Sequence, residues 1–406
     1  MKHYRYLIIG GGLAGDAAVR GIRELDTDGT LGMFGMETDP PYTRPALSKS
    51  LWKGRPLEKI WRNTQDMGVE LHLGRKIVSL DTLRKRAVDD QGGEYKFDKA
   101  LIATGGSPIH LPCASDRIIY YHDLQDYRRL RQLSERGARF LVIGGGFIGS
   151  EIAAALTSIG KQVTMVFRDE AIGASLFPGD LARFLNDYYR DRGVEVLPYE
   201  EIARVDENAD GVMVTTLTGR SLQVDGVVAG VGIRPNVELA QQAGLQLDNG
   251  ILVDEHLQTS AADIYAAGDA ANFLHATLSK RVRVEHEDNA LMMGRLAGRN
   301  MAGAGESYTH VPMFYSDLFD LGYEAVGALD SNLQMVADWH EPFRKGVVYY
   351  LDQGRVRGVL LWNVWKQVEA ARLLLAEAGP FTPADLKGRI SEKPAEPAAS
   401  PKGAPA

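Results

Sequence analysis

Three glycines near the start of the chain have a spacing that suits phosphate binding. Gly10, Gly12 and Gly15 form a G-x-G-x-x-G pattern. In such a pattern the first glycine permits a tight turn, the second lets the main chain approach a pyrophosphate, and the third lets a helix pack closely on a strand. The free N–H groups at the start of the helix then favour negatively charged phosphates. The pattern predicts a dinucleotide site.

The same spacing returns later in the chain, at Gly144, Gly146 and Gly149. One copy of so short a pattern is a weak indication, but two copies in the same strand–turn–helix context predict two dinucleotide sites. An acid that hydrogen-bonds a ribose is expected about twenty residues beyond the last glycine. The candidates are Glu37 for the first site and Asp169 for the second, although either could be a solvated loop acid.

The acid of the second site has a basic neighbour. Arg168 directly precedes Asp169, and an arginine at this place could hold the 2′-phosphate of NADPH. Asp169 would instead hydrogen-bond the ribose hydroxyls of NADH. The sequence favours NADH and leaves NADPH open.

The elements that must position these glycines can be read from the pattern around them. Runs of β-branched and apolar residues before each turn suit strands buried in a parallel sheet, and the segments after each turn have helical spacing. We expect strands at residues 5–9, 139–143 and 163–167, and helices at residues 16–25 and 150–159. Two copies of one βαβ opening predict two α/β nucleotide-binding domains.

The rest of the chain has a different pattern. Residues 212–217 and 221–224 flank a short turn and predict a hairpin, and residues 227–231 predict a buried strand. Further on, the pattern predicts antiparallel strands at 323–329, 346–351 and 355–361, a tight turn at 352–354 and a helix at 366–377. These would form a separate α+β domain. From Ser391 the composition is typical of disorder.

Composition excludes several classes of function. The 406 residues suggest two or three domains, and a net charge of −7 without a basic stripe argues against nucleic-acid binding. The sequence contains no run of eighteen apolar residues, so no segment is expected to span a membrane. Cys113 is the one cysteine, so a disulfide scaffold, a cysteine metal cluster and a two-cysteine redox centre are excluded. We expect a structural Cys113, no metal site, no targeting peptide before the first strand, and a reducing cytoplasmic location.

Several longer motifs carry a family resemblance. Residues 41–49 (PYTRPALSK), 103–108 (ATGGSP) and 264–270 (IYAAGDA), together with the paired glycine patterns, resemble the two-dinucleotide-binding flavoprotein reductases. The most similar branch holds the ferredoxin, rubredoxin and putidaredoxin reductases and apoptosis-inducing factor. The similarity to the last is strongest in residues 283–286, 294–298, 313–318, 322–325 and 359–363.

The resemblance implies a glutathione-reductase-like fold, with paired Rossmann-type α/β domains for FAD and NAD and an α+β C-terminal domain. The FAD-binding domain would be split into residues 1–112 and 234–311. The NAD(P)-binding domain would occupy residues 113–233 between these parts. The C-terminal domain would follow at 312–390, and a tail at 391–406.

The resemblance also implies roles for residues around the flavin. Asp269 would hold the ribityl or pyrophosphate part of FAD, and Arg44 would lie along the flavin. Lys49 would lie near the reactive N5 edge, and Glu151 would pair with it. Phe147 would cover the flavin face and move aside, or stack, when nicotinamide enters. On their own, Lys49 would be read as a surface residue and Glu151 as an early-helix acid favoured by the dipole.

Further residues would complete the site by the same resemblance. Glu285 and His286 would flank the adenine or nicotinamide side of the flavin, and Tyr315 would close the site. Tyr315 stands where a tryptophan would be expected, so its stacking should be somewhat weaker. Thr104 and Gly105, in the second motif, would also contact FAD.

The chain departs from the family pattern at two informative places. The expected acid for the FAD ribose falls on Met36, one position before Glu37, so either a shifted register or a lost contact is implied. A long insertion between the C-terminal strands is missing, and residues 338–345 are expected to join them.

The function implied is hydride transfer from NADH, or NADPH, to the flavin. The leading hypothesis then delivers electrons to a small ferredoxin or rubredoxin, because the chain has no internal cysteine relay. An alternative is a redox sensor in which a stable NADH–FAD charge-transfer complex controls oligomerisation into a homodimer. NADH:oxygen oxidase activity would be a side reaction.

Overall fold

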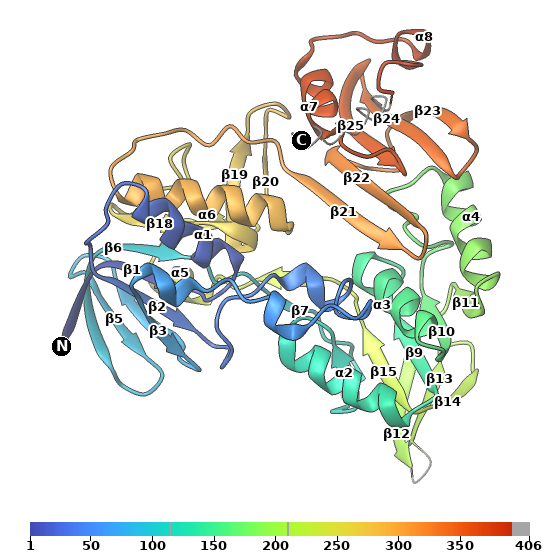
Figure 1. The fold of residues 1–406 in the computed structure, drawn as a ribbon, viewed down its shortest axis with the longest axis horizontal. Coiled ribbons are helices and arrows are strands. Elements are labelled where there is room, and N and C mark those ends of the chain that lie inside the picture. Colours follow the sequence, from blue (N-terminus) through green and yellow to red (C-terminus); the bar gives the residue numbers. More distant parts are fainter. Residues whose placement is uncertain (114, 209–210, 392–406) are drawn as a thin grey trace, which may run out of the picture.

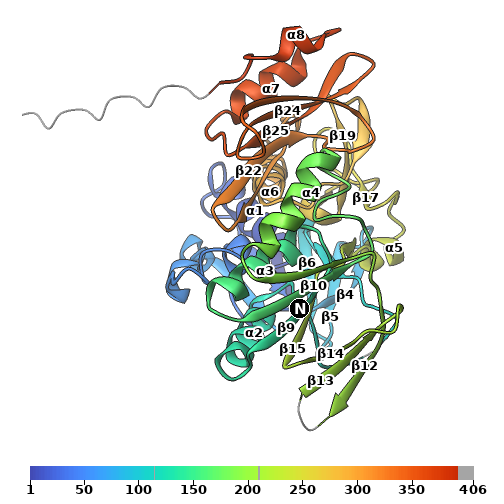
Figure 2. The ribbon, with the colours of Figure 1, turned by 90° about the vertical axis from the view of Figure 1, so that its right-hand side faces the viewer.

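The computed structural model describes residues 1–113, 115–208 and 211–391. It contains two sheets of Rossmann type and a C-terminal antiparallel sheet, as the sequence predicted (Figure 1). Figure 2 shows the C-terminal sheet and the small β12–β14 sheet at opposite ends of the molecule. The tail predicted to be disordered lies outside the described residues, apart from Ser391.

The first sheet has seven strands. β3, β2, β1, β6 and β18 pair in parallel, β5 is antiparallel to β6, and β4 is antiparallel to β5. Its central strands are largely buried, since all of β2 and the last four residues of β1 are nearly inaccessible to solvent. The strands are β1 (Lys2–Ile9), β2 (Leu31–Gly35), β3 (Val69–Leu73), β4 (Ile77–Asp81), β5 (Arg86–Asp89), β6 (Glu94–Ile102) and β18 (Ile264–Ala266).

Two helices cross closely on this sheet, α1 (Leu13–Arg23) and α6 (Glu287–Met301) (Figure 1). Glycines set the distance between them. A Cβ on Gly294 would lie 2.2 Å from the Ala14 carbonyl oxygen, and one on Gly298 would lie 2.1 Å from that of Ala18. Because only glycine fits there, the two helices can pack with their backbones in close contact.

The second sheet has five parallel strands in the order β11-β10-β9-β15-β8. A three-stranded antiparallel sheet lies beside it, and the predicted hairpin is confirmed as β13 paired with β14. The elements are β8 (Ile118–Tyr120), α2 (Leu124–Arg136), β9 (Arg139–Ile143), α3 (Phe147–Ser158), β10 (Gln162–Phe167), α4 (Gly179–Arg190), β11 (Val194–Pro198), β12 (Ile202–Asn208), β13 (Gly211–Thr216), β14 (Ser221–Val224) and β15 (Gly226–Ala229).

Short elements connect the two Rossmann-type sheets. A two-stranded antiparallel ribbon of β7 and β16 lies where the chain leaves the first sheet and returns to it. The ribbon strands are β7 (Gly106–Pro108) and β16 (Ile233–Pro235). A separate three-stranded sheet holds β17 (Ile251–Leu252), β19 (Ala271–His275) and β20 (Lys280–Val282). The other short elements are α5 (Glu238–Gln242) and the 3-10 helices η1 (Arg44–Leu47), η2 (Leu57–Lys59), η3 (Thr64–Met67) and η4 (Gly268–Ala270).

The C-terminal sheet has five antiparallel strands in the order β21-β22-β25-β24-β23, where the sequence predicted three. The prediction that residues 338–345 connect the later strands was wrong. Residues 338–341 continue β23, so only residues 342–344 form the turn. The elements are β21 (Met313–Leu318), β22 (Leu321–Gly327), β23 (Gln334–Glu341), β24 (Lys345–Asp352), β25 (Arg355–Trp362), α7 (Val368–Ala376) and α8 (Pro383–Leu386).

Both helices after the glycine patterns begin three residues earlier than predicted. Gly12 is the N-cap of α1 and Gly146 the N-cap of α3, each in an extended conformation. The last three residues of each pattern are therefore already helical. This places the second glycine of each pattern at the helix N-terminus, where the unpaired N–H groups lie.

Candidate functional site

The first glycine loop is shaped by contacts within the protein at two of its three positions. Gly10 has φ +130°, and a Cβ there would lie 2.0 Å from the Ala103 carbonyl oxygen. A Cβ on Gly15 would lie 2.2 Å from the Gly10 carbonyl oxygen. At Gly12 the described residues offer no atom within 4 Å of an added Cβ, beyond its own chain neighbours. Packing explains the first and third glycines, whereas the open side of the second fits an approaching phosphate.

The second glycine loop repeats this division. Gly144 has φ +112° and its Cβ would lie 2.3 Å from the Gly230 carbonyl oxygen, while a Cβ on Gly149 would lie 1.9 Å from that of Gly144. An added Cβ on Gly146 again meets nothing within 4 Å among the described residues outside the loop's own neighbours. A small hollow opens here, lined by Gly145, Gly146, Phe147, Ser150, Ile172, Gly173, Leu176 and Phe177 and by Leu318 and Tyr323 of the C-terminal sheet.

A buried acid lies in α3, just after the second glycine loop. Glu151, in α3, has a side chain that is 2% exposed, and it forms an ion pair with Lys49, which is 14% exposed. The Lys49 Nζ donates to both carboxylate oxygens, at 2.7 and 2.8 Å. Ser48 Oγ donates to Oε2 at 2.6 Å, and Ser316 Oγ donates to Oε1 at 2.5 Å. The structure brings the predicted pair together and adds two hydroxyl donors.

The two serines were not identified from the sequence. Ser48 precedes Lys49, and Ser316 follows Tyr315, so each stood inside a motif beside a residue that was singled out. Ser316 lies in β21 and is 1% exposed. Spacing along the chain cannot show that its hydroxyl faces a glutamate from a distant helix.

Three aromatic rings from different parts of the chain meet at the start of α3. His286 stacks on Phe314 with ring centres 4.3 Å apart, and Phe147 meets both edge-on, at 6.0 Å from His286 and 5.4 Å from Phe314. Burial lowers the pKa of His286 to about 4, so its ring is neutral near pH 7. Phe314 was missed in the sequence, although it lies in the same motif as Tyr315.

Tyr315 lies beside the Lys49–Glu151 pair. The Lys49 Nζ is 5.0 Å from the centre of the Tyr315 ring, within reach of a cation–π contact. The Tyr315 hydroxyl donates to Glu287 Oε2 at 3.2 Å. Burial raises the pKa of Tyr315 and also that of Glu287, because both charged forms would be poorly solvated there.

The acid after β2 has partners within the protein. Arg44 Nη2 donates to Glu37 Oε1 at 2.5 Å, and the Tyr42 hydroxyl donates to Oε2 at 2.6 Å. Arg44 also donates to the His122 carbonyl oxygen at 2.7 Å. The neighbouring Met36 is 61% exposed and makes no polar contact of this kind. Glu37 thus lies at the predicted place, in a cluster with the predicted Arg44.

Asp269 lies in η4, whose Gly268 packs against Ala14 of α1 and Ala290 of α6. Burial raises the pKa of Asp269 to about 6, with Glu285 adding to the rise, while Arg44 and Arg283 oppose it. Arg283 forms an ion pair with Glu285 at 2.5 Å and donates to the Asp269 carbonyl oxygen at 3.2 Å. Glu285 therefore lies beside Asp269, which the sequence motif alone did not indicate.

The remaining predicted residues fall into two groups. Thr104 Oγ1 donates to the Asn236 carbonyl oxygen at 2.7 Å, and the Asn236 N–H donates to the Gly105 carbonyl oxygen at 2.9 Å. These bonds tie the motif to the strand that returns from the second sheet. Arg168 and Asp169 follow β10 directly, and both are exposed.

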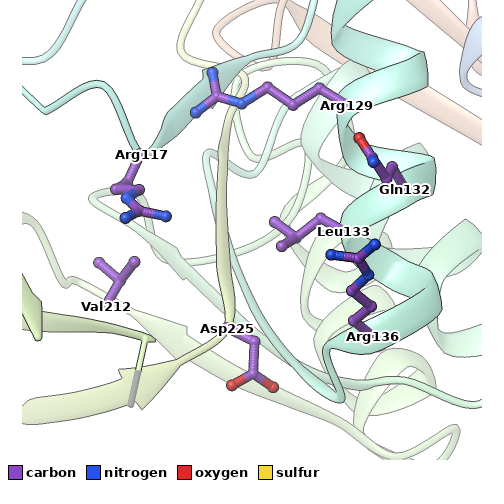
Figure 3. A pocket seen from close by; sticks show the side chains of 7 residues that line it. All are labelled: Arg117, Arg129, Gln132, Leu133, Arg136, Val212 and Asp225. Carbon is purple, nitrogen blue, oxygen red and sulfur yellow. The ribbon is translucent and has the colours of Figure 1, made fainter. Parts of the chain in front are cut away.

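Other features of the described residues lie apart from this site. Figure 3 shows a hollow between α2 and the β13 edge, lined by exposed arginines that include Arg117 and Arg129. Asp225, on its wall, pairs with Arg139 at 2.8 Å. None of the predicted site residues lines this hollow. Among the described residues, no group of three acids, histidines or cysteines could hold a metal, and no helix is long and apolar enough to cross a membrane.

Comparison with protein families gives two matches along the chain. The family described as "Pyridine nucleotide-disulphide oxidoreductase" matches residues 4–294. The family described as "Apoptosis-inducing factor, mitochondrion-associated, C-term" matches residues 297–342 and 337–377. Together these matches include every predicted site residue.

Individual proteins are similar over most of the chain. Apoptosis-inducing factor 1, mitochondrial, of Dictyostelium discoideum is 31% identical over 419 residues, covering 92% of this chain and 79% of that protein. The ferredoxin reductase subunit of the 5,5'-dehydrodivanillate O-demethylase of Sphingobium sp. is 33% identical over 391 residues, covering 93% and 94%. The crystal structure of the covalent putidaredoxin reductase–putidaredoxin complex contains a chain that matches with a TM-score of 0.88 at 29% identity, covering 95% of both chains.

Proposed function

Because the chain belongs to the pyridine nucleotide-disulphide oxidoreductase family, we propose that it is an FAD-dependent NAD(P)H oxidoreductase that passes electrons to a small iron–sulphur or rubredoxin-type protein. FAD, when bound, supplies the group that accepts a hydride and releases its electrons onward. The proposal rests on the buried Lys49–Glu151 pair, in a chain with two glycine loops whose second glycines are open.

The first sheet supplies the residues that would hold FAD. The N–H groups around Gly12, at the start of α1, would face the pyrophosphate, and Gly10 and Gly15 keep that turn tight. Asp269 would accept or share hydrogen bonds from the polar middle of the cofactor. The loop of Thr104 and Gly105 would border it.

On this proposal Arg44 holds Glu37 in place beside the cofactor rather than acting alone. Their 2.5 Å ion pair, joined by Tyr42, fixes the carboxylate in one orientation. Glu37, rather than the exposed Met36, is then the acid available to the FAD ribose.

The second sheet supplies the residues that would hold the nicotinamide nucleotide. The start of α3 at Gly146, with Gly144 and Gly149 shaping the loop, would face its pyrophosphate. Asp169 would accept from the ribose hydroxyls, which favours NADH. Arg168 would hold the 2′-phosphate of NADPH, so NADPH is a second possible reductant at the same site.

Residues from three parts of the chain would form the reactive edge. Lys49 would place a positive charge where negative charge develops as the hydride arrives, and Glu151 would keep Lys49 charged and fixed. Phe147, held by His286, would cover the face on which nicotinamide stacks and would turn aside when it enters. Tyr315 would close the site beside Lys49 and exclude water.

The onward acceptor is proposed from the relatives and from cysteine content. Relatives with similar length include a ferredoxin reductase subunit and a reductase solved with putidaredoxin. Cys113 is the one cysteine of this chain, so a dithiol relay within it is excluded. Electrons would therefore leave directly for a second protein.

Anaerobic stopped-flow reduction with NADH, and separately with NADPH, tests this proposal. We expect fast bleaching of the flavin band by NADH, followed by rapid reoxidation when a ferredoxin or rubredoxin is added. A panel of such acceptors that is reduced no faster than by free flavin would contradict the proposed partner class.

A second function has one observation in its favour. The C-terminal part matches the apoptosis-inducing factor family, which motivates a redox sensor whose long-lived complex with NADH changes its oligomeric state. Light scattering with and without NADH separates the two functions. An unchanged molar mass would remove the sensor, and NADH-dependent dimerisation with slow bleaching would favour it.

A further inference from the structure

The carboxyl edge of the second sheet holds an aromatic residue that the proposed mechanism does not use. Strands β10 and β11 are parallel neighbours, and Phe167 is level with Pro198 at their ends. Tyr199 follows β11, and its N–H donates to the Asp169 carbonyl oxygen at 3.2 Å. Tyr199 therefore lies directly beside the acid predicted to hold a ribose.

The Tyr199 ring is unusual in its exposure. It is 66% exposed, and Tyr199 and Trp365 are the two large aromatic side chains of the described residues that stand exposed. Within residues 1–113, 115–208 and 211–391, its hydroxyl has no hydrogen bond and its ring no aromatic or cation contact. The ring thus contributes nothing evident to packing.

The backbone at Tyr199 would also accommodate a smaller residue more easily. Its φ is +58°, in the left-handed region where glycine and asparagine are favoured over bulky side chains. A large exposed ring at such a position is not explained by local folding. A bound ring on its face would explain it.

The order of the strands matches the order of groups in an adenine dinucleotide. From the edge inward, the sheet runs β11, β10, β9, so that Tyr199, Asp169 and the second glycine loop follow one another along it. Neighbouring strands are about 4.8 Å apart, so the span from β11 to β9 is about 10 Å. That span suits adenine, ribose and pyrophosphate in sequence.

We propose that Tyr199 is a specificity residue that stacks on the adenine of the nicotinamide nucleotide. The proposal rests on the proposed use of NADH by the second glycine loop and adds the residue that recognises its base. The adenine lies against the ring, the ribose hydroxyls donate to Asp169, and the pyrophosphate accepts from the N–H groups at Gly146. Base–aromatic stacking needs no hydrogen bonds, so the ring's lack of polar partners is expected.

Two substitutions separate the ring from the backbone. Tyr199→Asn removes the ring but tolerates the positive φ, and Tyr199→Phe keeps the ring without the hydroxyl. Titration calorimetry of the FAD-loaded protein with ADP-ribose, which lacks nicotinamide, should show affinity lowered roughly 5- to 100-fold by Tyr199→Asn and little changed by Tyr199→Phe. Trp365→Ala, at the other exposed aromatic, is the matched control and should leave ADP-ribose affinity unchanged.

A second measurement uses reduced nicotinamide mononucleotide, which lacks the adenosine half. Its rate of flavin reduction should be the same in the wild type and in Tyr199→Asn, whereas kcat/KM for NADH should fall with the ADP-ribose affinity. Unaltered ADP-ribose affinity in Tyr199→Asn, an equal loss with the mononucleotide, or no ADP-ribose binding in the wild type would overturn the proposal. Failure of the proposed function would look different, because neither reductant would then bleach the flavin of the wild-type protein.

Discussion

At the scale of single residues, the chemistry centres on the Glu151 carboxylate. It accepts two hydrogen bonds from Lys49 and one each from Ser48 and Ser316, so both of its oxygens have two donors. A buried ion pair is tolerated when such additional hydrogen bonds satisfy the remaining lone pairs and protons of its charged groups. The pair is therefore a fixed charge arrangement rather than a flexible surface contact, which suits a group that must hold one position beside a reacting atom.

Removing either member of this pair should slow flavin reduction and leave FAD bound. We expect Lys49→Ala to lower the limiting rate of reduction by NADH by about tenfold or more, since a placed charge or donor contributes on that scale. Glu151→Ala should do the same and lower the free energy of unfolding by about 3–5 kcal/mol, because Lys49 then stays buried without its partner. Anaerobic stopped-flow and urea unfolding measure the two effects.

Lys53 provides the matched control, since its side chain is 62% exposed and pairs with Asp317 at the surface. Lys53→Ala should leave both quantities unchanged. Reduction at the wild-type rate in both site variants would remove Lys49 and Glu151 from the mechanism.

A second residue gives a prediction for acid stability. His275 in β19 is 3% exposed, its Nε2 has no partner among the described residues, and burial lowers its pKa to about 4. The unfolded chain, with the ordinary value near 6.5, therefore binds more protons between pH 6.5 and 4, and the folded protein loses stability as pH falls through that window.

Between pH 7 and pH 5 the contribution of His275 should be a loss of about 2 kcal/mol in the free energy of unfolding. Urea unfolding of His275→Asn at both pH values should show a pH dependence smaller by that amount. His256, whose side chain is 40% exposed, is changed to Asn as the control and should keep the wild-type dependence. Equal pH dependence in His275→Asn and the wild type would contradict the prediction.

At the scale of elements, the three glycines of each loop have different roles, two in packing and one in ligand binding. The first and third glycines are required because a Cβ would overlap a carbonyl oxygen of a neighbouring strand or of the loop itself. The second stands open at the N-terminus of a helix. Folding and ligand binding therefore depend on different glycines of the same turn, and substitutions can separate them.

Gly12→Ala should fold like the wild type but retain little FAD, because its Cβ meets no described residue and would occupy the cofactor's side of the loop. Gly15→Ala should destabilise the flavin-free protein by roughly 1–3 kcal/mol or more, since its Cβ would overlap the Gly10 carbonyl. Thermal unfolding of the flavin-free proteins and the ratio of flavin to protein absorbance measure these effects. A Gly12→Ala protein that keeps full flavin content would show that the cofactor does not approach this glycine.

At the scale of the whole molecule, the reactive pair is where three parts of the chain meet. Lys49 follows the 3-10 helix η1, between β2 and β3 of the first sheet. Glu151 lies in α3, which follows β9 of the second sheet. Ser316 lies in β21 of the C-terminal sheet. Strand β21 packs against α3 (Figure 1). The C-terminal sheet thus contributes to the site itself as well as covering it.

Ser316→Ala tests whether that contact matters. A hydrogen bond to a charged group contributes about 1.5–3 kcal/mol, so we expect a loss of that size in the free energy of unfolding. Flavin reduction should slow by less than in Glu151→Ala, because Lys49 and Ser48 remain. In a double-mutant cycle, Ser316→Ala should have no further effect once Glu151 is alanine.

Ser134→Ala is the matched control, since Ser134 is also buried but donates to a carbonyl oxygen within α2. It should change stability without changing the reduction rate. Strict additivity of Ser316→Ala and Glu151→Ala would show that the contact does not couple the C-terminal sheet to the pair.

Much of this protein was determined by its sequence alone. The two glycine patterns predicted two Rossmann-type sheets and their first helices, because hydrophobic periodicity and turn glycines are local properties of the chain. The family resemblance carried by the sequence motifs also implied that Lys49 and Glu151 would pair, as they do. Element ends were less certain, since the cap at Gly12 depends on where the turn closes against Ala103.

The partners of the reactive pair were decided only by the tertiary structure. Ser316 lies 165 positions from Glu151 along the chain, and Phe314 meets His286 and Phe147 from yet another element. Edge strands β21 and β23 were missed for the same reason, because their residues are only partly buried and their pattern is set by neighbouring strands. Contacts between distant segments depend on how whole elements pack, and no local spacing encodes that.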